Sequence, residues 1–358
     1  MILDILQIIV NNSYIKCQIR CSQINRNMYD NVHIYSINID ENINQQIIEK
    51  KIFHKLKILN CENCQRINNV NHLKNTLKIL NCSGNNGIDQ NSISELQFIE
   101  HLNCSFNSKI NNVNHLKNTL KILDCSGCSN VDQKGISELQ FIEKLICSDN
   151  NKIKNVNHLK NTLKILYCRW GCGIDQNGIS ELQFIEYLDC SFNNKINNVN
   201  HFKNTLKILY CGGGNIDQNG ISDLKFIKYL NCNNNKYICS VNHLKKTLKM
   251  LDCSGIYCGI DQYGISELEF IEFLDCNCNK KIDNVNHLKN TLKILDCSFT
   301  SAIDQNGISD SKHIEKLFCK YNIKINDVNH LNILKILDCS GPCGIDQDGI
   351  SRLFSLKE

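Results

Sequence analysis

Cysteine and histidine are the residue types in this chain with the most evident chemistry, because both bind zinc and cysteine also forms disulfides. The 358-residue sequence holds 23 cysteines and 11 histidines. Seven of the histidines occupy the same tripeptide, Val-Asn-His, which recurs about every 43 residues. Recurrence at one period is typical of a repeated structural position and not of a single metal centre. These histidines are His72, His115, His158, His201, His243, His287 and His330.

Two cysteine pairs have the Cys-x-x-Cys spacing of zinc and redox sites, Cys61 with Cys64 and Cys125 with Cys128. A zinc site needs two such pairs that converge, and these two are separated by several regular repeats. We interpret the second cysteine of each pair as a turn residue. The sequence therefore predicts no metal site and no cofactor. The alternative, a cysteine-rich metal-binding protein, is one that elemental analysis would test.

The sequence shows none of the other familiar catalytic arrangements. It contains no glycine-rich phosphate loop, no Ser-His-Asp set and no unique pair of carboxylates. The run Gly212-Gly213-Gly214 lacks the Lys-Ser/Thr tail of a phosphate loop. Every polar candidate recurs with the repeat, whereas an active site needs singular residues. The sequence thus predicts no catalytic residues, and we do not expect an enzyme.

The elements that position these residues are repeats, which begin near residue 56 and continue to the end of the chain. Each unit reads Leu/Ile-x-x-Leu-x-Cys. Alternation places the second leucine and the cysteine on one face of a short strand. Such a strand cannot bury its apolar face alone, whereas many of them stacked in a parallel sheet close a continuous core. The ladder cysteines, spaced 20 to 23 residues apart, are Cys61, Cys82, Cys104, Cys125, Cys147, Cys168, Cys190, Cys211, Cys232, Cys253, Cys276, Cys297, Cys319 and Cys339.

This unit resembles the leucine-rich repeat, Leu-x-x-Leu-x-Leu-x-x-Asn/Cys-x-Leu, with cysteine in place of one leucine. The resemblance covers about 300 residues in about fourteen units. It implies an α/β solenoid, a leucine-rich-repeat horseshoe with a parallel β-sheet on the concave face and short helices or turns on the convex face. It also implies that Asn107, Asn150 and Asn193 form a ladder whose amides hydrogen-bond the turn backbone.

Two kinds of unit alternate along the array. One kind carries an aspartate and resembles the cysteine-containing subclass of leucine-rich repeats that is common in F-box proteins. We interpret this aspartate as the N-cap of a short convex helix. The aspartates are Asp89, Asp132, Asp175, Asp217, Asp261, Asp304 and Asp346, each followed three residues later by Gly except the first, where Ser92 stands.

The same alternation sets the distance between the repeated histidines. Because each 43-residue period holds two strands, neighbouring Val-Asn-His copies lie ~10 Å apart, too far to share a metal.

A solenoid of this kind usually binds its partner on the concave sheet face. In each unit, the third residue before the ladder cysteine, the residue just before it and the residue just after it should point there. Aromatic residues gather at these positions in the middle of the array, which favours protein recognition. The aromatic residues that we predict to bind a partner are Tyr167, Tyr187, Tyr210, Tyr229, Phe273 and, at a strand end, Trp170.

The fourth residue before the ladder cysteine alternates between lysine and glutamate, which relieves like-charge stacking between neighbouring strands. Each exposed pair should contribute well under ~1 kcal/mol. From Lys78 onward the alternation fails once, where Lys207, Lys228 and Lys249 follow one another beside the tyrosines. We expect these lysines to bind an acidic or phosphorylated segment of the partner. The alternative is sequence drift in a decaying repeat.

Residues 1–50 lack the repeat, and residues 51–358 are predicted to form the solenoid. The apolar spacing in residues 15–29 suits short amphipathic helices. This stretch resembles the later helices of an F-box, although the opening Leu-Pro-x-Glu of that motif is absent. Two interpretations stay open. The segment is either a helical cap that shields the first core layer, or an F-box-like segment that binds a Skp1-type adaptor and makes the protein a substrate-recognition adaptor of a cullin ubiquitin ligase.

Composition sets the remaining expectations. The chain is 42% hydrophobic with a net charge of +4, which allows an extended core and gives no reason to expect a nucleic acid or a membrane as partner. No signal peptide or membrane span is visible, so we expect a cytoplasmic protein with reduced thiols. Similar repeat proteins occur in giant DNA viruses of amoebae. If the chain is viral, the expected location is the host cytoplasm. We expect a monomeric, non-enzymatic scaffold that binds a protein partner.

Overall fold

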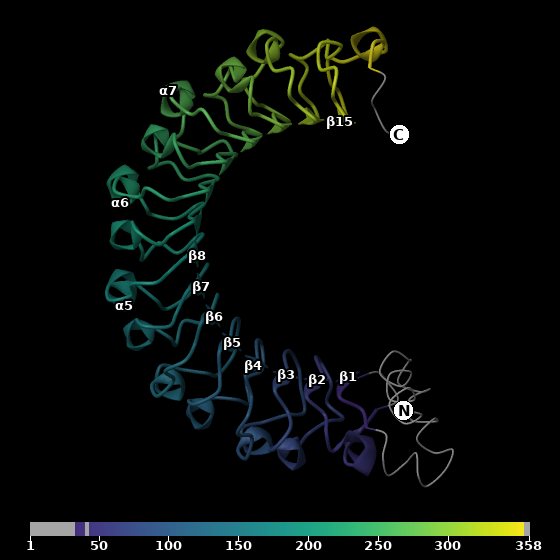
Figure 1. The fold of residues 1–358 in the computed structure, drawn as a ribbon, viewed down its shortest axis with the longest axis vertical. Helices are drawn as coiled ribbons and strands as arrows, with labels where there is room; N and C mark the ends of the chain where they lie inside the picture. The colour runs from purple at the N-terminus through teal and green to yellow at the C-terminus, as the bar shows by residue number, and fades with distance from the viewer. Residues whose placement is uncertain (1–32, 40–42, 354–358) are drawn as a thin grey trace, which may run out of the picture. The chain divides into compact units, whose positions relative to one another are not determined.

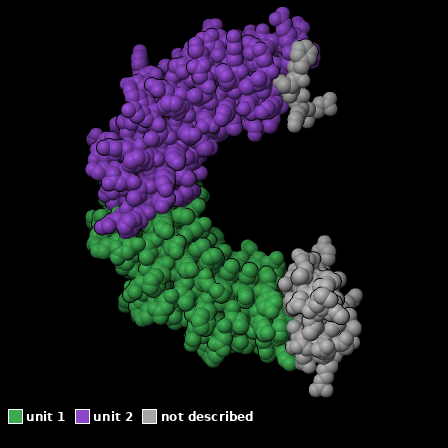
Figure 2. Space-filling model, viewed as in Figure 1, with its two compact units in different colours: residues 1–182 green, residues 183–358 purple. Residues whose placement is uncertain are grey.

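The computed structural model describes residues 33–39 and 43–353. The chain divides into two compact units, residues 1–182 and residues 183–358 (Figure 2). In each unit short strands line the concave side, and short helices line the opposite side (Figure 1). Residues 15–29, on which the F-box resemblance depends, lie outside the described residues. Among the described residues, no helix is long and apolar enough to cross a membrane.

Each unit contains one parallel sheet whose strands are three residues long and follow chain order. The strands of the first unit are β1 (Ser36–Asn38), β2 (Ile58–Asn60), β3 (Ile79–Asn81), β4 (His101–Asn103), β5 (Ile122–Asp124), β6 (Lys144–Ile146) and β7 (Ile165–Tyr167). Those of the second unit are β8 (Tyr187–Asp189), β9 (Ile208–Tyr210), β10 (Tyr229–Asn231), β11 (Met250–Asp252), β12 (Phe273–Asp275), β13 (Ile294–Asp296), β14 (Lys316–Phe318) and β15 (Ile336–Asp338).

Between most successive strands the chain returns through one short helical turn, whereas α4 and η1 both lie between β1 and β2, the described residues form no helix between β14 and β15, and η11 follows β15. Four of these turns are α-helical, namely α4 (Gln45–Ile48), α5 (Gln176–Ile179), α6 (Gln218–Ile221) and α7 (Gln262–Ile265). The others are 3-10 helices, namely η1 (Lys51–Phe53), η2 (Asn71–Leu73), η3 (Asn91–Ile93), η4 (Asn114–Leu116), η5 (Lys134–Ile136), η6 (Asn157–Leu159), η7 (Asn200–Phe202), η8 (Asn242–Leu244), η9 (Asn286–Leu288), η10 (Asn306–Ile308) and η11 (Asp348–Ile350).

The core of each unit is built from the leucine and cysteine ladders that the sequence predicts. In-register pairing stacks each central leucine on the next, for example Leu209 of β9 between Leu188 of β8 and Leu230 of β10. These leucines are fully buried, as are ladder cysteines such as Cys211. Leucine fills the centre of each strand, and the smaller cysteine follows at its end. Because of this arrangement, each repeat packs closely on the next repeat within the same unit.

Buried asparagines join successive turns. The amide of Asn150 donates to the carbonyl oxygens of Cys125 and Val131, both at 2.9 Å, and its Oδ1 accepts the backbone N–H of Lys152 at 3.0 Å. Asn107 forms the equivalent bonds one period earlier. The predicted asparagine ladder is therefore confirmed at these two positions, and it satisfies carbonyls that would otherwise be buried without partners. Asn193 is also buried, and its Oδ1 accepts the N–H of Lys195.

The repeated aspartates cap the convex turns, as predicted. Asp217 has extended backbone angles, and its carboxylate accepts the N–H of Gly220 at 2.8 Å at the start of α6. The same bond, to the residue three positions later, is made at all seven aspartates. It leads to Ser92 after Asp89 and to glycine after Asp132, Asp175, Asp217, Asp261, Asp304 and Asp346. These side chains satisfy orphan donors at helix starts.

The first strand precedes the predicted start of the solenoid at residue 51. Strand β1 pairs with β2 in the same register as the later strands, so that Ile37 stacks on Leu59. Ile34 and Ile37 are buried like the leucines of later repeats. The stretch thus reads Ile-x-x-Ile-x-Ile, in which Ile39 stands where later repeats have cysteine. The sheet therefore extends into the segment that the sequence assigns to the N-terminal cap.

Candidate partner-binding surface

The histidines of the Val-Asn-His tripeptides are structural. His115 lies in the middle of η4, and its Nε2 donates to the carbonyl oxygen of Ile93 in the preceding turn at 3.0 Å. His158 and His243 make the equivalent bond at 3.0 Å. Burial lowers the pKa of all three imidazoles, although the bond to the carbonyl opposes the shift. They are therefore neutral donors near pH 7 and are committed to the turn backbone.

The ladder thiols are also structural. Cys61, Cys104 and Cys319 are buried free thiols, and burial raises the pKa of each to about 12. A thiol that stays protonated is a poor nucleophile and a poor metal ligand. The Cys61 Sγ instead donates to the carbonyl oxygen of Asn81, 3.2 Å away on the next strand. Within residues 33–39 and 43–353, no group of three or more His, Cys, Asp or Glu residues could hold a metal ion.

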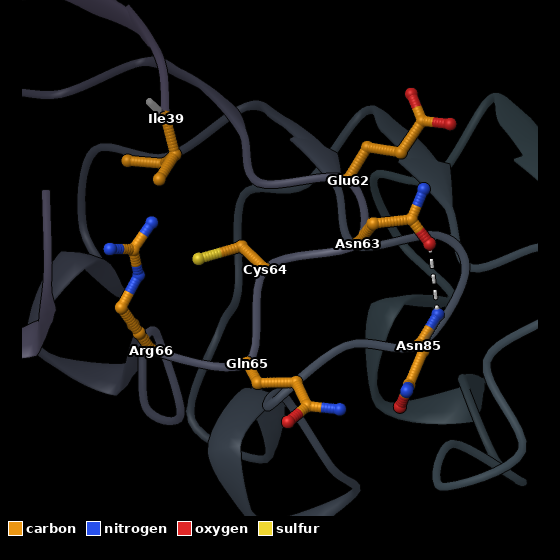
Figure 3. Close-up of a pocket in the computed structure, with 7 residues that line it drawn as sticks. All are labelled: Ile39, Glu62, Asn63, Cys64, Gln65, Arg66 and Asn85. Atoms are coloured by element: carbon orange, nitrogen blue, oxygen red, sulfur yellow. Dashed lines mark hydrogen bonds between the residues drawn. The ribbon is translucent and has the colours of Figure 1, made fainter. Parts of the chain in front are cut away.

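A hollow of about 670 Å³ lies beside the first turns of the first unit (Figure 3). The Cys64 thiol and the Arg66 guanidinium lie on one side of it, and the Glu62 carboxylate points away from them (Figure 3). Asn63 occupies the far side, where its Oδ1 accepts the N–H of Asn85 at 3.2 Å. The hollow thus gathers polar turn residues, and its one carboxylate is not aimed at its one thiol.

The strand face of the second unit carries a continuous apolar row. It consists of the first residue of each strand from β8 to β13, which parallel pairing places side by side. These residues alternate with the buried leucines and are therefore partly exposed, up to 42% for Met250. The row, called here the strand-face row, comprises Tyr187, Ile208, Tyr229, Met250, Phe273 and Ile294. It is the largest run of neighbouring apolar side chains that the strands of the second unit present.

Three of the predicted tyrosines meet within this face. Tyr187 and Tyr229 flank Ile208 in register, and Tyr210 lies between Asp189 and Asn231 at the other end of β9. The Tyr210 ring lies 5.6 Å from that of Tyr187 and 4.9 Å from that of Tyr229, the latter edge to face. Burial raises the pKa of Tyr229 well above its usual value, and its contact with Tyr210 raises it further. The three rings therefore form one preorganised cluster, called here the tyrosine cluster.

The remaining predicted aromatic residues lie elsewhere. Phe273 belongs to the strand-face row, two strands beyond Tyr229. Tyr167 and Trp170 belong to the first unit, where Lys144 places its ammonium 5.4 Å from the centre of the Tyr167 ring. Trp170 is 48% exposed and has a φ of 56° at the turn after β7. The structure thus brings together Tyr187, Tyr210 and Tyr229.

The predicted alternation of lysine and glutamate produces ion pairs at the edge where the strands begin. Glu100 accepts from Lys78 at 2.6 Å and lies 3.5 Å from Lys121. Glu272 likewise pairs with Lys249 at 3.0 Å and with Lys293 at 2.8 Å. The lysines lower the pKa of both carboxyls. One carboxylate thus links two lysines of neighbouring strands.

The interruption of this ladder lies one residue before β9, β10 and β11. Lys207 pairs with Glu186 at 2.5 Å, and Lys249 pairs with Glu272. Lys228 between them is exposed, and within the described part of the chain no carboxylate forms an ion pair with it. The run of three lysines is therefore not neutralised at its centre.

Three aspartates end neighbouring strands on the same face as the strand-face row. Pairing places Asp275 of β12 between Asp252 of β11 and Asp296 of β13. Burial raises the pKa of Asp275 to about 7, with smaller contributions from the charges of its two neighbours. Burial also raises the pKa of Asp252. Near pH 7 the Asp275 carboxyl is therefore incompletely ionised.

We expect Asp275→Asn to stabilise the protein above pH 7 and to flatten its dependence on pH. In the unfolded chain the carboxyl titrates near pH ~4, whereas in the folded chain it titrates near 7. Between these values the folded state binds the extra proton, so stability falls as pH rises from about 4 to about 7. Asparagine fits, because Asn231 at the same place in β10 also accepts the N–H two residues later. Melting temperatures from pH 4 to 8 test this, and an unchanged slope in the variant would contradict it.

The structure also contains a repeated surface that the sequence analysis, which considered the sheet face, does not predict. Three hollows of about 250 to 310 Å³ lie along the edge where the strands begin, each around an exposed phenylalanine and one Glu between two Lys. Those around Phe98 and Phe141 share Thr119 and Lys121 as a common wall. The signal was the repeated Phe-Ile-Glu, in which the phenylalanine precedes a buried isoleucine and therefore points outward. The phenylalanines exposed at this position of the repeat are Phe98, Phe141, Phe184, Phe270 and, where Phe-Ile-Lys replaces Phe-Ile-Glu, Phe226.

Comparisons with known proteins reveal relatives in structure but not in sequence. No family model matches the chain, and no curated protein matches it. An internalin (InlF) from Listeria monocytogenes has a TM-score of 0.50 and 16% identity, with 78% of this chain and 84% of that chain covered. The functional domain of InlJ from the same organism, which includes a cysteine ladder, has a TM-score of 0.52 and 18% identity, with 79% and 62% covered.

A third solved structure is the mouse RP105/MD-1 complex. It has a TM-score of 0.54 and 15% identity, with 91% of this chain and 64% of that chain covered. The present chain thus spans less than two thirds of the matched InlJ and RP105/MD-1 chains. At identities this low, the similarity supports the fold alone. The similar structures, together with the parallel strands, the leucine core and the capped convex turns, show that the chain has the leucine-rich-repeat fold.

Proposed function

We propose that the protein is a non-enzymatic scaffold that binds a protein partner on the strand face of its second unit. The observation that carries the proposal is the tyrosine cluster, whose rings contact one another at 4.9 and 5.6 Å on an otherwise open sheet face. Tyrosine combines a large apolar surface with a polar tip, and it is enriched among the residues that dominate binding energy at protein interfaces.

The surroundings of the cluster support a protein partner. The strand-face row extends the apolar surface from Tyr187 through Met250 to Ile294. The carboxyls of Asp252 and Asp275 border it, and Lys228 lies at its edge directly before Tyr229. An apolar centre with a polar border is the usual anatomy of a protein interface. Ring contacts fixed before binding also reduce the side-chain entropy that binding must overcome.

The test compares the proteins captured by the full chain with those captured by Tyr187→Ala/Tyr229→Ala. We expect the double substitution to weaken binding of the specific partner about 1,000-fold, since two interface hot spots contribute about 2 kcal/mol or more each. The partner is identified from capture on the wild-type chain, and its affinity for each purified variant is then measured by calorimetry.

The matched control is Ile79→Ala/Ile122→Ala, which removes partly exposed side chains from the same strand position in the first unit. This control should bind the partner like the wild type. Equal binding by the tyrosine variant and the wild type would contradict the proposal. Equal weakening by both pairs of substitutions would place the binding surface elsewhere on the solenoid.

A further inference from the structure

The edge around Phe226 departs from the repeat more than any other part of the ion-pair ladder. In the first unit, the corresponding place around Phe141 holds Gln140, Glu143 and Asn161. Around Phe226 the three equivalent positions are all lysine, namely Lys225, Lys228 and Lys246. Replacement of Gln and of Asn by Lys adds one charge each, and replacement of Glu by Lys adds two, so this place is more positive by four charges.

The backbone brings these lysines to one edge. The N–H of Lys228 donates to the carbonyl of Lys207 at 2.8 Å, and that of Lys249 donates to Lys228 at 3.0 Å. The Thr247 hydroxyl, next to Lys246, donates to the carbonyl of Lys225 at 3.1 Å. Phe226, 49% exposed, stands between Lys225 and Lys228 in sequence. The five residues called here the lysine patch are Lys207, Lys225, Lys228, Lys246 and Lys249.

The patch lacks an internal counterion at its centre. In the regular ladder a glutamate such as Glu272 bridges two lysines, Lys249 and Lys293. At the centre of the patch Lys228 takes the place of that glutamate, and within the described residues Lys225, Lys228 and Lys246 form no ion pair. Like charges on strands about 4.8 Å apart repel. A bound anion would relieve this repulsion by taking the place of the missing carboxylate.

The patch is also short. Glu186 pairs with Lys207 on one side and Glu272 with Lys249 on the other. The unbroken positive stretch therefore spans three strands, about 10 Å. A long polyanion such as a nucleic acid or an anionic membrane would meet these carboxylates, whereas a single dianionic group would not. Lysine ammonium groups bind phosphate well as point charges, and Phe226 offers an apolar surface to the residues beside the phosphate.

We propose that the lysine patch is a subsite for one phosphorylated side chain of the protein partner. This inference rests on the proposed function, because Lys228 directly precedes Tyr229 and so joins the patch to the tyrosine cluster. An extended partner segment on the strand-face row would place a phosphorylated residue at the edge where the strands begin. The phosphate supplies about −1.5 to −2 charges near pH 7, which the three lysines without ion pairs can neutralise.

The first experiment measures binding of the full chain to a fluorescent peptide with one phosphoserine flanked by leucines, by fluorescence anisotropy. We expect the phosphorylated peptide to bind at least about tenfold more tightly than the unphosphorylated one, since each charge-assisted hydrogen bond contributes about 1.5 to 3 kcal/mol. The variant K225Q/K228E/K246N should lose this preference. It restores the residue types that the repeat has elsewhere, and its new central carboxylate can pair with Lys207 and Lys249, so we expect it to melt no lower than the wild type.

The second experiment transfers the patch to the first unit. The triple substitution Q140K/E143K/N161K, added to the variant that lost the patch, should restore a preference for the phosphorylated peptide that is smaller than in the wild type, because no tyrosine cluster adjoins the transferred lysines. The surrounding residues already match, because Lys121, Phe141 and Lys164 line that hollow as Lys207, Phe226 and Lys249 line the patch. A transfer that produces no preference would contradict the claim that these lysines create the site.

The remaining outcomes are equally decisive. Inorganic phosphate should compete only at much higher concentration than the phosphopeptide, and equal affinity for the two would indicate a free-anion site and overturn the proposal. Tighter binding of single-stranded RNA than of the phosphopeptide would also overturn it. The Tyr187→Ala/Tyr229→Ala variant should weaken both peptides together while keeping their ratio. Loss of the ratio alone therefore reports on the patch, and equal binding by this tyrosine variant reports against the proposed function.

Discussion

Replacement of Leu209 by alanine should lower the free energy of unfolding of the second unit by about 3 kcal/mol, within a range of about 2 to 5. Leu209 is fully buried at the centre of β9 and is stacked between Leu188 and Leu230. Truncation removes its apolar contacts and leaves a cavity, because the stacked backbones on both sides are fixed by strand hydrogen bonds and cannot collapse into the space.

The control for Leu209 is its neighbour in the chain. Ile208 lies on the opposite side of β9, half-buried between Tyr187 and Tyr229. Alanine there should lower stability by about 1 kcal/mol or less, because the side chain is already partly in water and no closed cavity forms. Hydrogen exchange of the amides in β8 to β10 measures both effects locally, which matters because a repeat array need not unfold in one step. Equal losses at the two positions would contradict the assignment of the two faces.

Replacement of Asn150 by alanine should lower the stability of the first unit by about 2 to 4 kcal/mol. The asparagine donates to the carbonyls of Cys125 and Val131 and accepts the N–H of Lys152. Alanine removes all three bonds at once and leaves two carbonyl oxygens buried without a donor. Each such group costs about 1 to 3 kcal/mol, because water cannot reach it to replace the lost partner.

The matched control is Asn151→Ala, an exposed asparagine one residue further along the same turn. This change should alter stability by no more than about 0.5 kcal/mol. Chemical denaturation followed by circular dichroism compares the two variants with the wild type. A loss at position 150 no greater than that at position 151 would show that the asparagine bonds do not hold the turns together.

Much of the fold follows from the sequence because each repeat contacts mainly its neighbours. A side chain that recurs every unit must occupy an equivalent place in each, so alternation alone identifies the buried leucines and cysteines. The same argument identifies Asp217 as a helix cap and Asn150 as a turn bond, since both satisfy backbone groups within one or two units. The strand β1 was missed because isoleucines take the place of the ladder residues, with Ile39 where later units have cysteine.

The candidate site depends more on the tertiary structure. The sequence identifies Tyr187, Tyr210 and Tyr229 as facing the sheet surface, but their ring contacts of 4.9 and 5.6 Å arise from residues 19 to 23 positions apart that only the strand register brings together. The edge hollows were not predicted, because they form between the side chains of successive units.

For the charged residues, too, the sequence predicts one part of the arrangement and the tertiary structure decides the rest. The sequence determined that lysine and glutamate alternate and that the alternation fails at Lys228. Only the structure decided that, among the described residues, Lys228 has no ion pair while Lys207 and Lys249 each keep one, and that Asp275 is partly buried between two other carboxyls. The physical reason is that periodicity specifies which face a residue occupies. Ion pairing, ring contact and desolvation depend instead on side-chain distances across strands, which exist only once the repeats have stacked.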